Sequence, residues 1–278
     1  MTRLVRTVGQ AREILEPHRR AGASLGFVPT MGALHDGHLS LVRAAGQDND
    51  VVVVSVFVNP LQFGPDEDFA SYPRDLDADT AVLDRHGVDV VFSPASAGFA
   101  PTTVTVCVAG VTERLEGASR PGHFDGVATI VAKLLHTVGP DRAYFGEKDY
   151  QQLLVLRAMA RDLAMPVEIV ACPTVREPDG LAASSRNAGL SPDERAAAAA
   201  LPAALRAVAG SWGGDAGYAR DCLRRTLEAA PGVRLDYAEV CDPETLEPLE
   251  GVVGGPAQAL IAAHVGATRL IDNIRLEP

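Results

Sequence analysis

The chain has 278 residues, 47% hydrophobic and 22% charged, a composition typical of a globular protein with two unequal domains rather than of a disordered chain or a coiled coil. Its formal net charge of −11 argues against a nucleic-acid partner or a membrane surface, because such surfaces depend on clustered Lys and Arg. The four cysteines are scattered and form no C-x-x-C pair, which fits a reducing compartment. The sequence shows neither a signal peptide after Met1 nor an apolar run long enough to span a bilayer, so we expect a cytoplasmic protein.

Strands and helices are predicted to alternate through the first part of the chain. Strands are expected at residues 24–29, 51–58, 88–92, 142–145 and 167–171. Helices are expected at residues 38–45, through Leu76, Val82 and Leu83, through Val127, Ile130, Val131, Leu134 and Leu135, and at residues 151–164. The β-branched run at 51–58 is typical of a central parallel strand covered on both faces. The alternation predicts an α/β fold with a doubly wound, Rossmann-like parallel sheet over residues 1–174.

The pattern changes after Pro173. A loop rich in Ser, Asn and Gly precedes an Ala-rich helix expected at residues 193–209, with Ser191 as its cap and Pro192 in its first turn. A second helix is expected at 218–229, followed by strands at 234–241, 259–265 and 269–274. These elements predict a smaller α+β domain over residues 175–278.

The loop after the first predicted strand has the features of a phosphate-binding turn. It reads Pro29, Thr30, Met31, Gly32, Ala33, Leu34, His35, Asp36, Gly37, His38. In open parallel sheets ligands bind at this edge, and amides at a helix start point toward an anion. Gly32 and Gly37 let phosphates approach the main chain. His35 and His38 are expected on one side of the turn, where imidazoles donate hydrogen bonds to phosphate and stabilise charge in a transition state.

The residues alone leave two other interpretations of this histidine pair. His35 and His38 fit a purely structural role as polar residues at a helix start. They also fit a metal site, although the sequence supplies no obvious third ligand. Neither a G-x-x-x-x-G-K-[ST] loop nor a G-x-G-x-x-G turn occurs, so the P-loop and dinucleotide-binding folds lose their usual support. The glycines and the strand-loop-helix context favour a nucleotide site.

Two later segments carry similar chemistry. Residues 146–149 read GEKD between a predicted strand and helix, where Lys148 suits a triphosphate and Asp149 equally suits a helix cap. Residues 184–186 read SSR on the loop that leaves the sheet, and they fit either a clamp for departing pyrophosphate or an ordinary exposed loop. Gln62 and Gln152 offer neutral amides suited to a hydroxy acid, but also fit surface positions.

Several strings resemble one known family. The H-x-G-H turn resembles the nucleotidylyltransferase superfamily, and PTMGALHDGH at 29–38 is similar to pantothenate synthetases, the pantoate–beta-alanine ligases. VFVNPLQFGPDEDFASYPR at 56–74, RPGHFDGVATIVAKL at 120–134, FGEKDYQQL at 145–153 and SSRN at 184–187 match in the same order. The family usually has Met before the serines, and Ala183 here puts only a packing contact in doubt.

The resemblance implies a role for particular residues. It implies catalytic roles for His35, His38, Lys148, Ser184, Ser185 and Arg186. It implies ATP binding by residues 29–38, by Gly146, Glu147, Lys148 and Asp149, and by Val175, Ala183, Ser184, Ser185 and Arg186. It implies pantoate and β-alanine binding by Met31, Asn59, Gln62 and Gln152. It leaves open whether Arg120 and His123 hold the substrate or their own loop.

The implied reaction joins pantoate to β-alanine at the expense of ATP, giving pantothenate, AMP and pyrophosphate through a pantoyl adenylate. Mg²⁺ is expected to bind mainly through the ATP phosphates, a homodimer is the usual family state, and the smaller domain is expected to close as a lid. Three rivals remain: a cytidylyl- or adenylyltransferase, a small aminoacyl-tRNA synthetase and a nucleotide sensor without turnover. Acidity and the missing lysines of a KMSKS loop weigh against the synthetase, and the intact His and Lys residues weigh against the sensor.

Overall fold

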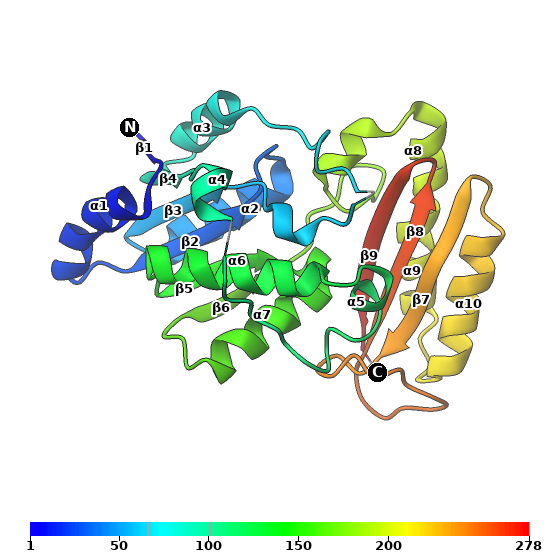
Figure 1. Ribbon diagram of the computed structural model, residues 1–278. Helices are drawn as coiled ribbons and strands as arrows, with labels where there is room; N and C mark the ends of the chain where they lie inside the picture. Colours follow the sequence, from blue (N-terminus) through cyan, green and yellow to red (C-terminus); the bar gives the residue numbers. More distant parts are fainter. Residues whose placement is uncertain (66, 101, 278) are drawn as a thin grey trace. The chain divides into compact units, whose positions relative to one another are not determined.

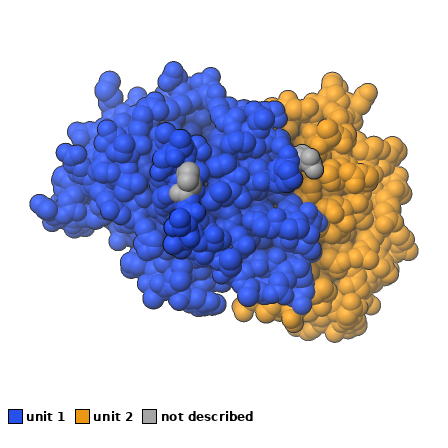
Figure 2. All heavy atoms as spheres, viewed as in Figure 1, with its two compact units in different colours: residues 1–147, 151–173 blue, residues 148–150, 174–278 orange. Residues whose placement is uncertain are grey.

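The computed structural model describes residues 1–65, 67–100 and 102–277, which fold into two compact units (Figure 1). The larger unit consists of Met1–Glu147 and Gln151–Pro173, and the smaller unit consists of Lys148–Tyr150 and Thr174–Pro278. Figure 2 colours the two units separately. The short segment Lys148–Tyr150 therefore belongs to the smaller unit, although its neighbours in sequence on both sides belong to the larger one.

The larger unit is built on a six-stranded sheet whose paired strands are all parallel. Its strands are β1 (Arg3–Val5), β2 (Leu25–Thr30), β3 (Val51–Val56), β4 (Val90–Phe92), β5 (Arg142–Gly146) and β6 (Glu168–Cys172), in the spatial order β1-β4-β3-β2-β5-β6. The order runs one way from β2 through β3 and β4, and the other way through β5 and β6. The predicted doubly wound α/β sheet is confirmed.

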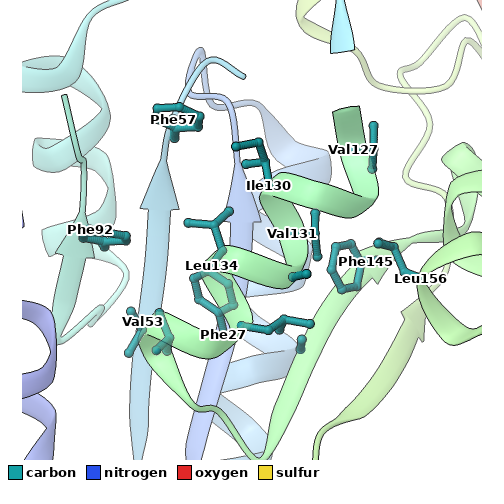
Figure 3. Packing of buried hydrophobic residues seen from close by; sticks show 14 of the residues in the cluster. Phe27, Val53, Phe57, Phe92, Val127, Ile130, Val131, Leu134, Phe145 and Leu156 are labelled. Carbon is teal, nitrogen blue, oxygen red and sulfur yellow. The ribbon is translucent and has the colours of Figure 1, made fainter. Parts of the chain in front are cut away.

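Helices cover this sheet, and α6 forms the centre of one face. The helical segments are α1 (Val8–Arg20), α2 (Asp36–Asp48), η1 (Pro60–Gln62), α3 (Leu76–Arg85), α4 (Ser96–Phe99), α5 (Glu116–Ser119), α6 (His123–Val138), η2 (Glu147–Asp149) and α7 (Tyr150–Asp162). Figure 3 shows Leu134 of α6 beside Phe27 of β2, and Val131 of α6 beside Phe145 of β5, all buried. Burying side chains of this size stabilises the unit by about 1.5–3 kcal/mol each.

The first strand and helix were not predicted from the sequence. β1 spans only three residues, and just one of them, Val5, is buried. The start of α1 nevertheless carries a readable capping box, because Gln10 N donates to Thr7 Oγ1 at 3.1 Å and Thr7 N donates to Gln10 Oε1 at 3.2 Å. The T-x-x-Q spacing was therefore the sequence signal for this helix.

The smaller unit packs helices against a three-stranded antiparallel sheet, which confirms the predicted α+β class. Its elements are η3 (Ser185–Gly189), α8 (Pro192–Ala198), α9 (Ala200–Gly210), α10 (Ala216–Glu228), β7 (Val233–Cys241), β8 (Ala257–Val265) and β9 (Thr268–Leu276). β8 lies between β7 and β9. The buried side chains of these helices and strands form a separate hydrophobic cluster.

One helix prediction for the smaller unit was wrong. The single helix expected at 193–209 is two helices, α8 and α9, separated at Ala199. Pro202 explains the break, because a proline inside a continuous helix removes a hydrogen bond and clashes with the preceding turn. In the structure Pro202 lies in the first turn of α9, where its missing N–H is not needed. The cap was predicted correctly, since Ser191 and Glu194 form a capping box.

Candidate functional site

The loop after β2 lies where the strand order of the sheet reverses. β2 pairs with β3 on one side and with β5 on the other (Figure 1). Ligands of open α/β sheets bind beyond the carboxyl ends of the strands at such a switch point, because the following helices diverge there. The predicted phosphate-binding loop is thus at the position where this fold binds ligands.

The backbone of this loop is held in a left-handed conformation by a carboxylate from another helix. Gly32 has φ +83° and Ala33 has φ +50°. The N–H groups of Ala33 and Leu34 donate to the two oxygens of Asp79 on α3, both at 3.0 Å. Asp79 is only 6% exposed. A Cβ at position 32 would lie 2.7 Å from Asp79 Oδ2, so both the conformation and the space require glycine.

The two histidines cap the helix that follows the loop. His35 is the N-cap residue of α2, and its Nδ1 accepts the N–H of Gly37 at 3.2 Å. The His38 Nδ1 accepts the N–H of His35 at 3.4 Å. The rings lie 4.0 Å apart between centroids. The helix therefore begins at Asp36, two residues earlier than predicted, and the prediction that both imidazoles share one side of the turn is confirmed.

These caps determine the protonation pattern of both rings. A neutral imidazole carries one proton, so an Nδ1 that accepts a backbone N–H leaves the proton on Nε2. His35 and His38 are thus Nε2–H donors at the positive end of the α2 macrodipole. A structural role and a phosphate-binding role are therefore compatible here, because each uses a different ring nitrogen.

A set of amide side chains lies beside the loop. Asn59 is 3% exposed, and its Nδ2 donates to Gln62 Oε1 and to the Gly126 carbonyl, both at 3.0 Å. Gln62 Nε2 donates to Met31 Sδ at 3.2 Å. The structure therefore gathers Met31, Asn59 and Gln62, three of the four residues that the family resemblance assigns to pantoate.

Arg120 and His123 hold the loop that carries Gln62. Arg120 makes a bidentate ion pair with Glu67 at 2.7 and 2.5 Å, and its Nη1 donates to His123 Nε2 at 3.1 Å. His123 Nδ1 in turn donates to the Gln62 carbonyl at 2.8 Å. Burial and the Arg120 charge lower the pKa of His123 to about 4, so the imidazole is neutral at pH 7.

Glu67 keeps its charge in this network. Desolvation raises the pKa of Glu67, but the hydrogen bonds and charge of Arg120 outweigh it and leave the pKa below its ordinary value. Of the two roles that the sequence left open for Arg120 and His123, the structure shows the contact with their own loop, because both side chains bind the Gln62 carbonyl.

Gly146 ends β5, and the residues after it change from one unit to the other. Glu147 belongs to the larger unit and Lys148 and Asp149 to the smaller one. Lys148 Nζ lies 3.4 Å from Asp149 Oδ1, and the Lys148 side chain is 21% exposed. Asp149 lies in the last position of η2, directly before α7.

The predicted Ser-Ser-Arg loop is anchored by the residue that follows it. Ser184 caps η3 by accepting the N–H of Arg186 at 3.3 Å. Asn187, 5% exposed, donates to Glu177 Oε1 at 2.6 Å and to the Ala182 carbonyl at 3.0 Å. Ala183 N donates to the Val175 carbonyl at 2.9 Å. The half-buried Ser184–Arg186 segment therefore follows directly after a hairpin and leads into η3, with hydrogen bonds on both sides of it.

Gln152 and its neighbour have separate environments. Gln152 is half-buried in the first turn of α7, and its assignment to pantoate stays a prediction. Gln151 is 3% exposed, donates to the carbonyls of Val111 and Arg114, and accepts the Glu116 N–H. Sequence reasoning missed the structural role of Gln151, and no pattern in the sequence distinguishes the two glutamines.

Sequence reasoning also missed Asp79. Its partners lie 46 and 45 residues away in sequence, so no local motif indicated the contact. Sequence reasoning also missed Glu67, the carboxylate that pairs with Arg120. The only available signal was that a partly buried arginine needs an acidic partner.

Neither a metal centre nor a membrane span emerges from the described residues. Within 1–65, 67–100 and 102–277, no three His, Cys, Asp or Glu side chains are grouped so that they could hold a metal ion. Over the same ranges, every helix is too short or too polar to cross a bilayer.

Comparisons with known proteins agree with this geometry. Residues 3–275 match the sequence model of the family described as pantoate-beta-alanine ligase. Pantothenate synthetase of Moorella thermoacetica is 51% identical over 279 residues, covering 99% of this chain and 98% of that protein. Pantothenate synthetase of Acidobacterium capsulatum is 58% identical over 264 residues, covering 91% and 86%.

Solved structures extend the likeness to the fold. The crystal structure of pantothenate synthetase from Thermus thermophilus has a TM-score of 0.93 at 50% identity and covers 99% of this chain and 100% of that one. Pantoate-beta-alanine ligase from Francisella tularensis, crystallised with beta-gamma ATP and beta-alanine, has a TM-score of 0.81 at 34% identity and covers 99% and 97%. The full-length sequence match and the shared fold place this chain in the pantoate-beta-alanine ligase family of enzymes.

Proposed function

We propose that the protein condenses pantoate with β-alanine in two steps at the loop after β2. In the first step a carboxylate oxygen of pantoate attacks the α-phosphorus of ATP, and the bond to pyrophosphate breaks. In the second step the β-alanine amine attacks the acyl carbon, the bond to AMP breaks, and the amine loses a proton. The Francisella tularensis relative, crystallised with beta-gamma ATP and beta-alanine, supports these substrates.

The observation that carries the proposal is the pair of capped histidines. The Nδ1 atoms of His35 and His38 are engaged by backbone N–H groups, so each Nε2–H is a donor of fixed orientation at a helix N-terminus. Donors held in place before the reaction stabilise charge that spreads over phosphoryl oxygens, because they need no reorganisation in the transition state. The proposal assigns this role first to His38.

The remaining predicted residues complete the proposed site. Residues 29–38, 146–149, Val175 and 183–186 are assigned to ATP, with Lys148, Ser184, Ser185 and Arg186 on its phosphates. Met31, Asn59, Gln62 and Gln152 are assigned to pantoate and β-alanine.

The substrate is ATP with Mg²⁺ on its phosphates. Both oxygens of Asp79 are taken by the amides of Ala33 and Leu34, so this buried carboxylate beside the loop serves the backbone rather than a metal ion. The cytoplasmic location, the homodimer and the lid action of the smaller domain stay predictions.

The best test of the His38 assignment separates its two functions. His38→Ala removes both the cap and the Nε2 donor, so its effect is ambiguous. His38→Gln keeps a cap acceptor, because Gln10 fills the same position of α1 in this chain and accepts the N-cap N–H. We expect His38→Gln to retain the melting temperature and to lower the rate of pantoate-dependent pyrophosphate exchange into ATP by about 100-fold or more.

Two controls make this test decisive. Exchange by the wild-type enzyme must require pantoate, and AMP must accumulate only after β-alanine is added. Exchange that requires an amino acid instead, or AMP release without β-alanine, would show that the proposed reaction is wrong. Full exchange activity of the folded His38→Gln enzyme would remove His38 from the phosphate-binding role.

A further inference from the structure

The segment that carries Lys148 is attached to the smaller unit by two side-chain contacts. Lys148–Tyr150 is grouped with that unit although it connects β5 to α7. The Asn273 amide donates from Nδ2 to the Lys148 carbonyl at 2.9 Å. The Tyr150 hydroxyl donates to the Pro243 carbonyl at 2.9 Å. The backbone on which the Lys148 side chain stands is thus held by residues more than 90 positions away in sequence.

The orientation of the Asn273 amide is determined by its neighbour on β8. Gln258 Nε2 donates to Asn273 Oδ1 at 2.8 Å, so the Asn273 amide nitrogen is the group that faces Lys148. Gln258 is 2% exposed and Asn273 7% exposed. Burying an amide costs free energy unless the amide is hydrogen-bonded. If these two side chains served packing alone, apolar side chains would fill the same space without that cost.

The residue before Asn273 anchors the second proposed phosphate-binding segment. Asp272 is 4% exposed and forms a bidentate ion pair with Arg176, at 2.7 and 3.0 Å. Arg176 pairs with Ala182 in the hairpin that leads into Ser184. The Asn273 N–H also donates to Asp272 Oδ1 at 2.8 Å. Two successive residues of β9 therefore hold the backbone of Lys148 and the base of the Ser184 loop.

We propose that Asn273 is a positioning residue that aligns the Lys148 ammonium with the Ser184–Arg186 loop as one rigid phosphate-binding body. The inference rests on the proposed function, in which Lys148 acts on the phosphates of ATP. Lys148 lies in a short 3-10 turn, where few helical hydrogen bonds fix its peptide. Loss of the Asn273 contact lets this peptide rotate and displaces the ammonium group, while the side chain itself remains present.

Asn273→Asp is the sharpest test variant. Aspartate keeps the size of the side chain and the acceptor for Gln258, but presents an oxygen to the Lys148 carbonyl in place of a donor. We expect pyrophosphate exchange to fall by about 10- to 100-fold, because a displacement of about 1 Å has that effect on a reacting group. The KM for pantoate should stay within about twofold, since uniform binding of that substrate is untouched.

A matched control separates positioning from stability. Leu270→Ala makes a cavity on the same strand without touching Lys148, and should lower the melting temperature without slowing exchange at a temperature where the protein is folded. Gln258→Met provides a second route, because it frees the Asn273 amide to rotate and should slow exchange even if Asn273→Asp folds poorly. Equal exchange rates in all three folded variants and the wild type would overturn the proposal.

A double-mutant cycle measures whether the effects of the Lys148 and Asn273 substitutions on the exchange rate are coupled. Coupling is expected if Asn273 positions Lys148, and not if Asn273 only stabilises the fold. In the Lys148→Ala background, Asn273→Leu should change the exchange rate by less than about twofold, because the group that Asn273 positions is gone. Effects that multiply would overturn the proposal.

The cycle also distinguishes the two levels of inference. If Lys148→Ala alone has no effect, the proposed role of Lys148 fails together with this inference. If Lys148→Ala slows exchange but Asn273→Leu does not, only the positioning role fails.

Discussion

Asp79→Ala should loosen the phosphate-binding loop and destabilise the larger unit. The substitution removes the carboxylate that binds the amides of Ala33 and Leu34, each at 3.0 Å and largely shielded from water. A hydrogen bond to a charged group contributes about 1.5–3 kcal/mol, so the two together contribute about 3–6 kcal/mol. For a unit of this size that loss corresponds to a melting temperature about 6–24 °C lower.

Thermal denaturation and pyrophosphate exchange, measured on the same samples, check this prediction. Asp77→Ala is the matched control, since Asp77 is a more exposed carboxylate on the same helix. Asp79→Asn should be intermediate in stability, because its amide accepts only one of the two N–H groups and directs a donor at the other. Exchange should fall about 10-fold or more in both Asp79 variants at temperatures where they are folded. A melting temperature within about 2 °C of the Asp77→Ala value, or unchanged exchange, would refute the reasoning.

Two further predictions concern the segment that holds Gln62. Gly126→Ala places a Cβ 2.1 Å from the Leu61 carbonyl oxygen, so α6 and η1 must separate. We expect the free energy of unfolding, measured by denaturant titration, to fall by about 2–4 kcal/mol, and the KM for pantoate to rise clearly. An unchanged KM would contradict the pantoate assignment. His123 has a folded-state pKa of about 4, below the ordinary 6.5 of an unfolded chain. The contribution of its neutral side chain to the stability of the folded protein is therefore fully present above pH 6.5 and is lost as the pH falls toward 4. When the pH is lowered from 6.5 to 4, the free energy of unfolding should fall by about 2–3 kcal/mol less in His123→Asn than in the wild type. Parallel pH profiles of the two proteins would show that His123 does not titrate in this way.

Much of the larger unit could be predicted because its signals are local. The β-branched run of β3, the apolar spacing of α6 and the turn residues after β2 each lie within a short window, and each indicated the right element. The errors have local causes as well. β1 is too short to show a pattern, and Pro202 divides a helix that its alanines would otherwise make continuous.

The predicted site residues were indicated by motif, whereas the contacts that orient them are tertiary. The sequence by itself determined the family, the parallel sheet, and the positions of the two histidines, the Lys148 segment and the Ser-Ser-Arg loop. Only the folded chain decided that both imidazoles use Nδ1 as caps, that Arg120 and His123 hold the Gln62 loop, and that Lys148 is grouped with the smaller unit.

The physical reason lies in the range of the interactions. Helices and strands follow from periodicities of two to four residues, which a sequence displays directly. A buried carboxylate or amide instead binds whichever backbone group the fold brings within about 3 Å, regardless of separation along the chain. Asp79 reaches back 46 residues to Ala33, and Asn273 reaches back 125 residues to Lys148. Tertiary structure alone selects such partners: Asp79 fixes the backbone of the loop after β2, and Asn273 binds the backbone of Lys148.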